Sequence, residues 1–154
     1  MSKLIKIYTD GSSIGNPGPG GYGIVMLSED GEYKKEFSQG FKITTNNRME
    51  LRAVIVGLEN LKLKNCSVKI YTDSKYVSDA VEKGWLFDWV KKDFKNKKNP
   101  DLWRRFLKIY KNHKVKFQWI KGHNNDFYNE RCDFLANLAA KNSSLLEDKG
   151  YTLN

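Results

Sequence analysis

The chain has 154 residues, of which 40% are hydrophobic and 29% are charged, and this suits one globular domain with a full core. It has no apolar run near the ~20 residues that a membrane-spanning helix needs and no signal-peptide pattern, so we expect a cytoplasmic protein with no membrane partner. With no secretory signal, we expect the two cysteines to be reduced thiols, and the formal net charge of +9 favours a polyanionic partner.

The first predicted element is an apolar strand over residues 4–8 that ends on Asp10. A carboxylate is thereby placed at the carboxyl edge of the sheet. Residues 15–23 contain five glycines and two prolines, which indicate turns and bare backbone close to that edge. The pattern suits a site for metal and phosphate, and it equally suits a surface aspartate that opens a tight turn.

Two further strands and a helix follow. Residues 22–27 and 33–43 predict strands that pair with the first as an antiparallel meander, with a hairpin turn at residues 29–32. Residues 48–61 show a helical apolar stripe. Glu50 lies three residues after Asn47, which is capping-box spacing, so this acid suits both a helix end and a ligand role.

The fourth predicted strand, residues 67–72, is followed by Asp73. Its ending, Ile-Tyr-Thr-Asp, repeats the ending of the first strand. A crossover helix between the two strands would make them parallel, so both aspartates would lie at one edge. The alternative is that Asp73 only caps a helix over residues 74–83.

A strongly basic segment occupies residues 83–114. It contains nine lysines, two arginines and three aspartates, so its net charge is +8. Aromatic residues, including Phe94 as a candidate stacker, are interleaved with these charges, which is typical of nucleic-acid binding; a solvated helical face is the alternative. We expect a short helix over residues 86–92, a lysine-rich projection over residues 95–100, and a helix over residues 102–112 capped by Asp101.

The last predicted elements are a fifth strand over residues 115–120 and a helix over residues 128–141. This helix carries Asp133, and we expect Leu135, Leu138 and Ala139 on its apolar side. One domain is predicted over residues 1–142. Residues 143–154 show no period, so we expect them to form a mobile C-terminal tail.

Four acids stand near the ends of these elements: Asp10, Glu50, Asp73 and Asp133. Clustered carboxylates repel one another unless a cation neutralises them, and oxygen-only ligands favour a hard ion such as Mg²⁺, for which Mn²⁺ is a substitute. Two such ions roughly 3.5–4 Å apart would serve phosphodiester hydrolysis. Two histidines are too few for a histidine-rich zinc site.

Several stretches together resemble type 1 ribonuclease H of the bacterial, single-domain kind. They run from the first strand to the last helix: residues 8–12, 15–23, 44–51, 71–74, 121–123 and 129–133. The resemblance implies an α/β, ribonuclease H-like fold with a five-stranded mixed sheet in the order 3-2-1-4-5, flanked by helices. It also implies an endonuclease, expected as a monomer, that cuts the RNA strand of RNA–DNA hybrids and leaves 5′-phosphate and 3′-hydroxyl ends.

The resemblance assigns roles to individual residues. The four acids match the metal-binding carboxylates, and His123 matches a loop histidine associated with proton transfer or product release. The expected hybrid contacts are Asn16, Thr45, Asn46, Asn47, Trp85, Lys91, Lys92, Lys95, Lys97 and Lys98. Amide side chains suit a minor groove that displays base edges and 2′-hydroxyls.

Two features depart from the family pattern. The lysine-rich projection is short, and Asp88 stands where the family's pattern has an asparagine that holds a DNA phosphate with the threonine matching Thr45. The rival functions are a non-catalytic hybrid-binding module on the same fold, another nuclease or transposase-like enzyme, and a basic architectural protein. The architectural protein should bind nucleic acid without needing Mg²⁺.

Overall fold

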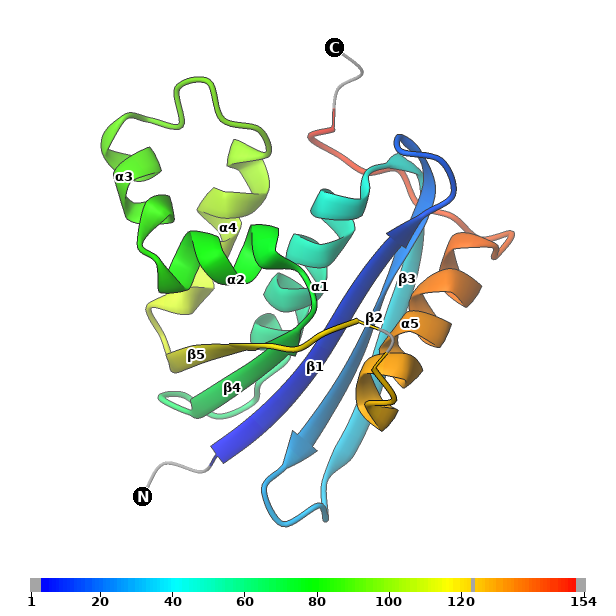
Figure 1. The fold of residues 1–154 in the computed structure, drawn as a ribbon, viewed down its shortest axis with the longest axis vertical. Helices are drawn as coiled ribbons and strands as arrows, with labels where there is room; N and C mark the ends of the chain where they lie inside the picture. The colour runs from blue at the N-terminus through cyan, green and yellow to red at the C-terminus, as the bar shows by residue number, and fades with distance from the viewer. Residues whose placement is uncertain (1–3, 123, 152–154) are drawn as a thin grey trace.

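The computed structural model describes residues 4–122 and 124–151, and it contains one five-stranded sheet with helices on both faces (Figure 1). The elements in chain order are β1 (Leu4–Ser13), β2 (Gly18–Ser28), β3 (Lys34–Thr44), α1 (Asn46–Glu59), β4 (Ser67–Thr72), α2 (Lys75–Glu82), α3 (Trp85–Lys91), α4 (Pro100–Tyr110), β5 (Lys114–Trp119) and α5 (Phe127–Ala140).

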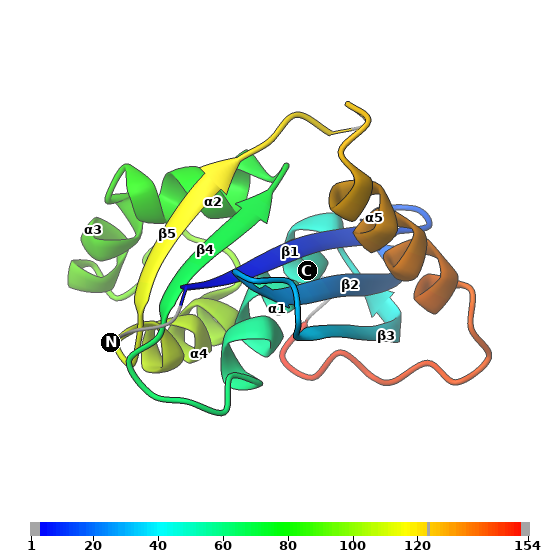
Figure 2. The same cartoon turned by 90° about the horizontal axis from the view of Figure 1, so that it is seen from below.

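The order of the strands is β3-β2-β1-β4-β5, which confirms the predicted mixed sheet. β1, β2 and β3 pair antiparallel, whereas β4 runs parallel to β1 and to β5. The parallel pairing follows from the crossover through α1. α5 packs on β1, β2 and β3, and Figure 2 shows it on the side of the sheet away from β5.

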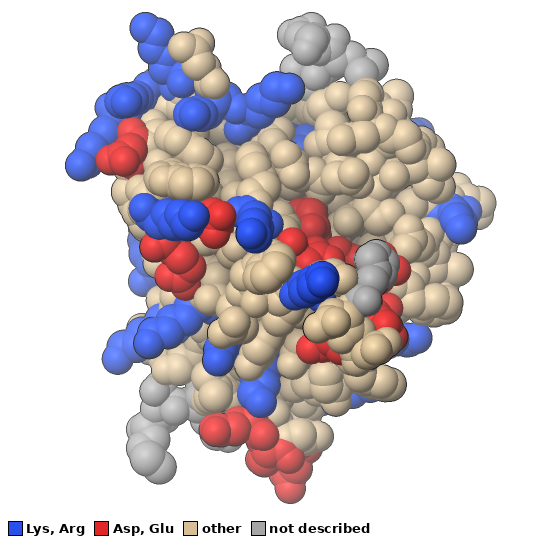
Figure 3. Space-filling view, viewed as in Figure 1, with Lys and Arg blue, Asp and Glu red and all other residues tan. Residues whose placement is uncertain are grey.

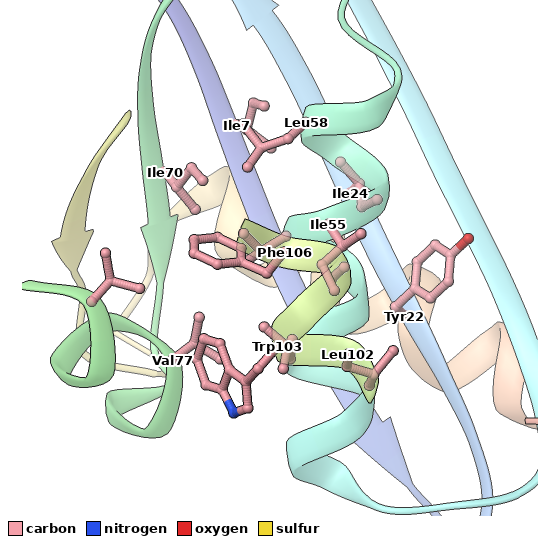
Figure 4. Close-up of a cluster of buried hydrophobic side chains, with 14 of the residues drawn as sticks. Ile7, Tyr22, Ile24, Ile55, Leu58, Ile70, Val77, Leu102, Trp103 and Phe106 are labelled. Carbon is pink, nitrogen blue, oxygen red and sulfur yellow. The ribbon is translucent and has the colours of Figure 1, made fainter. Parts of the chain in front are cut away.

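The main core lies between the sheet and α1, α2 and α4, as Figure 4 shows. Ile7 of β1, Ile55 of α1, and Trp103 and Phe106 of α4 are fully buried there. Burial of each such side chain stabilises the fold by about 1.5–3 kcal/mol. This core holds α1 against β1 and β2, and it therefore fixes the position of Glu50 relative to the sheet.

The first strand is longer than predicted. Asp10 pairs with Gly23 and Ser13 with Gly20, so β1 continues beyond the aspartate and the connecting turn shrinks to residues 14–17. The glycine-rich stretch therefore belongs mainly to β2. A Cβ atom at Gly21 would lie 2.7 Å from the Ala136 carbonyl oxygen, which shows that these glycines admit the backbone of α5.

The predicted helix caps need correction. Thr45, and not Asn47, caps α1, because its side chain accepts a hydrogen bond from the Arg48 amide (3.2 Å). Ser74 caps α2 in the same way through Val77, which leaves the Asp73 carboxylate outside the helix. The N-cap of α4 is Asn99, in left-handed backbone conformation (φ 63°) and without a side-chain cap.

Two predictions about apolar side chains were also wrong. Leu138 is 56% exposed, and the buried face of α5 is formed by Cys132, Ala136, Ala139 and Ala140. Phe94 is only 6% exposed and lies under the Arg104 guanidinium, so its ring is not available for stacking on a base.

The segment after α5 packs back on the domain as far as it is described. Leu146 bridges to Phe41 of β3, and the buried Asp148 carboxylate pairs with Arg48 and Arg52 of α1. These contacts hold Leu146 and Asp148 against the domain. The mobility expected for the tail as a whole, residues 143–154, stays a prediction. None of the helices within the described ranges is both long and apolar enough to cross a membrane.

Candidate active site

Three of the four predicted metal ligands meet at one end of the sheet. Asp10 comes from β1, Asp73 directly follows β4, and Glu50 reaches the same point from α1. Their ligand atoms all lie within 4.8 Å of one another. Parallel pairing of β1 and β4 explains why the two aspartates coincide, because Tyr8 and Tyr71 are aligned partners and each aspartate lies two residues further on.

The approach of α1 is permitted by a glycine. A Cβ atom at Gly11 would lie 2.8 Å from Cβ of Met49, so any other residue would push the start of α1, and with it Glu50, away from Asp10. The glycine that follows Asp10 therefore serves the geometry of the site through close packing.

The electrostatics of the cluster are unfavourable without a cation. Burial and the negative charge of Asp73 raise the pKa of Asp10 to about 8. Burial and the charges of Asp10 and Asp73 raise the pKa of Glu50 well above its usual range. Each carboxylate disfavours ionisation of the next, so the group binds either protons or a cation at neutral pH.

The residues present fit a hard divalent cation. All the gathered ligands are carboxylate oxygens, which is the donor set that Mg²⁺ prefers. The Glu50 Oε1 atom is buried and has no hydrogen-bond partner in the described part of the chain, which is expected of an oxygen whose partner is a cation.

Asp133 lies beside these three acids, but it is not part of the group whose ligand atoms lie within 4.8 Å of one another. When Asp10 is protonated, its carboxyl group donates a hydrogen bond to the Asp133 carboxylate, which contributes to the raised pKa of Asp10. Asp133 also accepts a hydrogen bond from Nδ2 of Asn137 (3.2 Å), and Asn137 accepts one from the Ser12 hydroxyl (2.7 Å). Asp133 is thus oriented toward the site from α5.

The loop after β5 passes close to Asp73. A Cβ atom at Gly122 would lie 2.7 Å from Oδ2 of Asp73, and the Trp119 indole donates to the Asp73 carbonyl oxygen (3.0 Å). His123, the predicted proton-transfer residue, lies outside the described residues, and its role stays a prediction.

The predicted minor-groove residues come together at the turn between β1 and β2. Oδ1 of Asn16 accepts a hydrogen bond from the Asn46 amide (3.1 Å), and the Ser13 hydroxyl donates to Oδ1 of Asn46 (3.0 Å). Asn16, Asn46 and Asn47 are exposed, and Thr45 is half-buried at the start of α1. This arrangement offers amide groups on a surface next to the carboxylates.

The predicted basic residues lie around α3 and the projection after it. All five of the predicted lysines are exposed: Lys91, Lys92, Lys95, Lys97 and Lys98. Trp85 is 46% exposed with the Lys83 ammonium 5.3 Å from its ring centroid. Figure 3 shows basic side chains gathered over this projection, separated from an acidic patch near the centre of the same face.

Some residues that build the site carry no local signal in the sequence. Ser12 and Asn137 orient Asp133, yet they are 125 positions apart. Gly122 lies in the family-like stretch 121–123, but its close approach to Asp73 has no local signal. The repeated strand endings were the one local pattern that predicted convergence.

Comparison with known proteins extends these observations. The RNase H family model matches residues 2–141. The chain is 57% identical over 148 residues to a ribonuclease H of Desulforamulus reducens, covering 93% of this chain and 91% of that protein. It is 53% identical over 152 residues to a ribonuclease H of Trichodesmium erythraeum, covering 96% and 95% of the two chains.

Solved structures give the same result. The LC9 ribonuclease H1, described as a type 1 enzyme with the type 2 active-site motif, superimposes with a TM-score of 0.82 at 31% identity, covering 91% of this chain and 73% of that one. The LC11 ribonuclease H1, solved in complex with an RNA/DNA hybrid, gives a TM-score of 0.68 at 32% identity and covers 88% and 96%. The matched family model, the close relatives and the shared fold show that this chain belongs to the ribonuclease H family.

Proposed function

We propose that the protein is an endonuclease that hydrolyses the RNA strand of RNA–DNA hybrids and leaves 5′-phosphate and 3′-hydroxyl ends. The observation that carries the proposal is the convergence of Asp10, Glu50 and Asp73 within 4.8 Å beside an exposed amide surface, in a molecule that also presents a basic projection. Membership of the ribonuclease H family and the hybrid bound to a structural relative support the substrate.

The proposed cofactor is Mg²⁺, two ions per site, with Mn²⁺ as a substitute. Asp10, Glu50 and Asp73 would hold the ions, and Asp133 would complete the set from α5. Bound ions of this kind supply Lewis acidity, which favours deprotonation of an attacking water and stabilises the leaving oxygen.

A second group of residues would bind and orient the hybrid. Asn16, Thr45, Asn46 and Asn47 would contact base edges and 2′-hydroxyls in the minor groove, where an RNA strand differs from DNA. Trp85 and the five projection lysines would grip the DNA strand through its phosphates. His123 would transfer a proton or assist product release, as its match to the family implies.

A non-catalytic hybrid-binding module on this fold is the alternative function. It would be favoured by the loss of a metal carboxylate, and all four acids are present in this sequence. The predictions of a monomer and of a cytoplasmic location rest on the sequence alone.

The proposal is tested by incubating the protein with labelled RNA–DNA hybrid, double-stranded RNA and duplex DNA, each with and without Mg²⁺. We expect cleavage of the hybrid's RNA strand only, and only with the metal. Binding without cleavage in Mg²⁺ and Mn²⁺ would establish the binding module instead. Cleavage of duplex DNA would indicate a nuclease of another class.

A further inference from the structure

Three lysines form a row across the sheet. Lys6 of β1 is the aligned partner of Lys69 of β4, and Lys69 is the aligned partner of Lys116 of β5. Neighbouring strands are about 4.8 Å apart, and residues aligned in this way point to the same face. The row therefore places three positive charges side by side on one surface.

This row lies on the face of the sheet opposite the main core. Ile7 and Ile70, which alternate with the lysines, are fully buried in that core, so Lys6 and Lys69 point the other way. Tyr8 and Tyr71, the next residues on the lysine face, stack on each other with ring centroids 4.4 Å apart.

The same face is covered by α5 only over β1, β2 and β3. Figure 2 shows β4 and β5 lying to one side of α5. Among the described residues, α2 contacts β5 through the main core on the opposite face, and α5 makes no extensive contact with β4 or β5. The uncovered strip is two strands wide, about 10 Å.

The lysines of the strip have no acidic partners. None of Lys6, Lys69, Lys114 and Lys116 forms a salt bridge within the described residues. Lys69, Lys114 and Lys116 also line a hollow of about 680 Å³ together with Lys111, and its lining contains no carboxylate. Like charges that are direct neighbours in a sheet destabilise it, and an anion laid across them would relieve that repulsion.

The row leads directly to the carboxylate cluster. Lys6 and Asp10 are four residues apart on β1, and Lys69 and Asp73 have the same spacing from β4. At about 3.3 Å per residue, the lysines stand about 13 Å from the acids on the same face. A chain of phosphates that leaves the active site along these strands would pass over the lysine row.

We propose that the lysine row, Lys6, Lys69 and Lys116, binds the phosphates of a single-stranded extension of the nucleic-acid strand held at the carboxylates. This inference rests on the proposed function. A positively charged strip about 10 Å wide beside a helix suits one strand, and single strands are commonly held in such basic tracks. The site is distinct from the lysine-rich projection, which belongs to α3 and its following turns.

The test compares a blunt hybrid with hybrids that carry a single-stranded extension of the RNA at the 5′ or the 3′ end. Binding is measured against salt in Ca²⁺, which we expect to support binding without cleavage. The double variant Lys69→Gln/Lys116→Gln should flatten the salt slope by about 1.4 on the hybrid with the extension that reaches the row, at ~0.7 per contact. Its slope on the blunt hybrid should not change.

The matched control is Lys35→Gln/Lys108→Gln, which removes two exposed lysines from β3 and α4 and should leave every slope unchanged. An unchanged slope for the row variant on both extensions, or an equal loss on the blunt hybrid, would overturn the proposal. If the double variant does not fold, Lys116→Gln at the edge strand gives the same test with half the change. Cleavage of the blunt hybrid by the unaltered protein is scored separately, so a failure here is distinguished from a failure of the proposed function.

Discussion

At the scale of single residues, the raised pKa of Asp10 shows why the site favours a bound cation. Its pKa is raised to about 8 by burial and by the charge of Asp73, against about 3.9 for an ordinary aspartate. Between these two values the folded protein binds more protons than the unfolded chain. Stability of the metal-free protein should therefore fall as pH rises from about 4 to about 8.

This gives the first prediction. In a chelator, Asp10→Asn should raise the melting temperature at pH 8 relative to the unaltered protein and flatten its decline between pH 4 and 8. Adding Mg²⁺ should stabilise the unaltered protein more than the variant, because only the former keeps the full ligand set. Thermal unfolding followed by circular dichroism checks both effects, with the exposed Glu29→Gln as control. A variant less stable than the parent at pH 8 would contradict the account.

A second prediction concerns the choice of strand. If Asn16 and Asn46 recognise 2′-hydroxyls, a hybrid with one 2′-deoxy unit beside the scissile bond should be cut poorly at that bond. A matched hybrid with the deoxy unit far from the bond should be cut normally. Mapping the products by gel electrophoresis distinguishes the two. Equal cutting at both bonds would mean that the shape of the duplex alone is recognised.

At the scale of elements, the start of α1 is fastened to α4 and to the segment after α5. The fully buried Arg48 pairs with Asp101 of α4 (2.8 Å) and with Asp148 (2.8 Å), and Asp148 also accepts from Thr44 (2.7 Å). Burial tends to raise the pKa of Asp148, but its hydrogen bonds to Arg48 and Thr44 outweigh this and the net shift is downward.

The third prediction follows from this network. Asp148→Asn should lower the free energy of unfolding by about 3–5 kcal/mol, because it leaves Arg48 as a buried charge with a weaker partner. Urea unfolding at pH 7 measures the loss, and the exposed neighbour Glu147→Gln is the control. Since the folded pKa is depressed, the stabilisation is present above about pH 4 and is lost as pH falls below it. A loss below 1 kcal/mol would show that the network contributes little.

The limits of sequence-based prediction also appear at this scale. The strands and helices were predicted because their apolar periods are local, and Asp10 and Asp73 converge because the same strand ending occurs on parallel neighbours. The cap of α4 was predicted wrongly because the Asp101 side chain accepts a hydrogen bond from Arg48 of α1, a helix that is distant in the sequence. The role of Asp148 was invisible because its partners are about 100 residues away. The glycines of β2 were assigned to a loop because α5, which needs the space, comes last in the chain.

At the scale of the whole molecule, positive charge is separated from the acidic site. The exposed lysines of the projection lie around and beyond α3, away from the carboxylates within β1 and directly after β4. Such a separation lets the phosphates of one strand bind at a distance while the other strand is cut. The lysines should then affect affinity more than the rate of the bound complex.

The fourth prediction tests this division. Lys95→Ala/Lys97→Ala/Lys98→Ala should flatten the salt slope of hybrid binding by roughly 2 to 3 units, at ~0.7–0.9 per phosphate contact. The rate on saturating hybrid should change little. In the same assay Asp88→Asn should tighten binding if that carboxylate repels the strand. An unchanged slope for the triple variant would make the projection a solubility feature.

The central claim is that the clustered carboxylates hold the metal that cuts the RNA strand, and Asp73→Asn tests it most directly. The variant keeps the size of the side chain and the Ser74 cap of α2 while removing an anionic ligand. Single-turnover cleavage of a labelled hybrid in Mg²⁺ should fall by on the order of 10³ or more, since each ~1.4 kcal/mol is tenfold. Hybrid affinity should persist, and the exposed Glu130→Gln should cleave normally. Near-normal cleavage by Asp73→Asn would contradict the account.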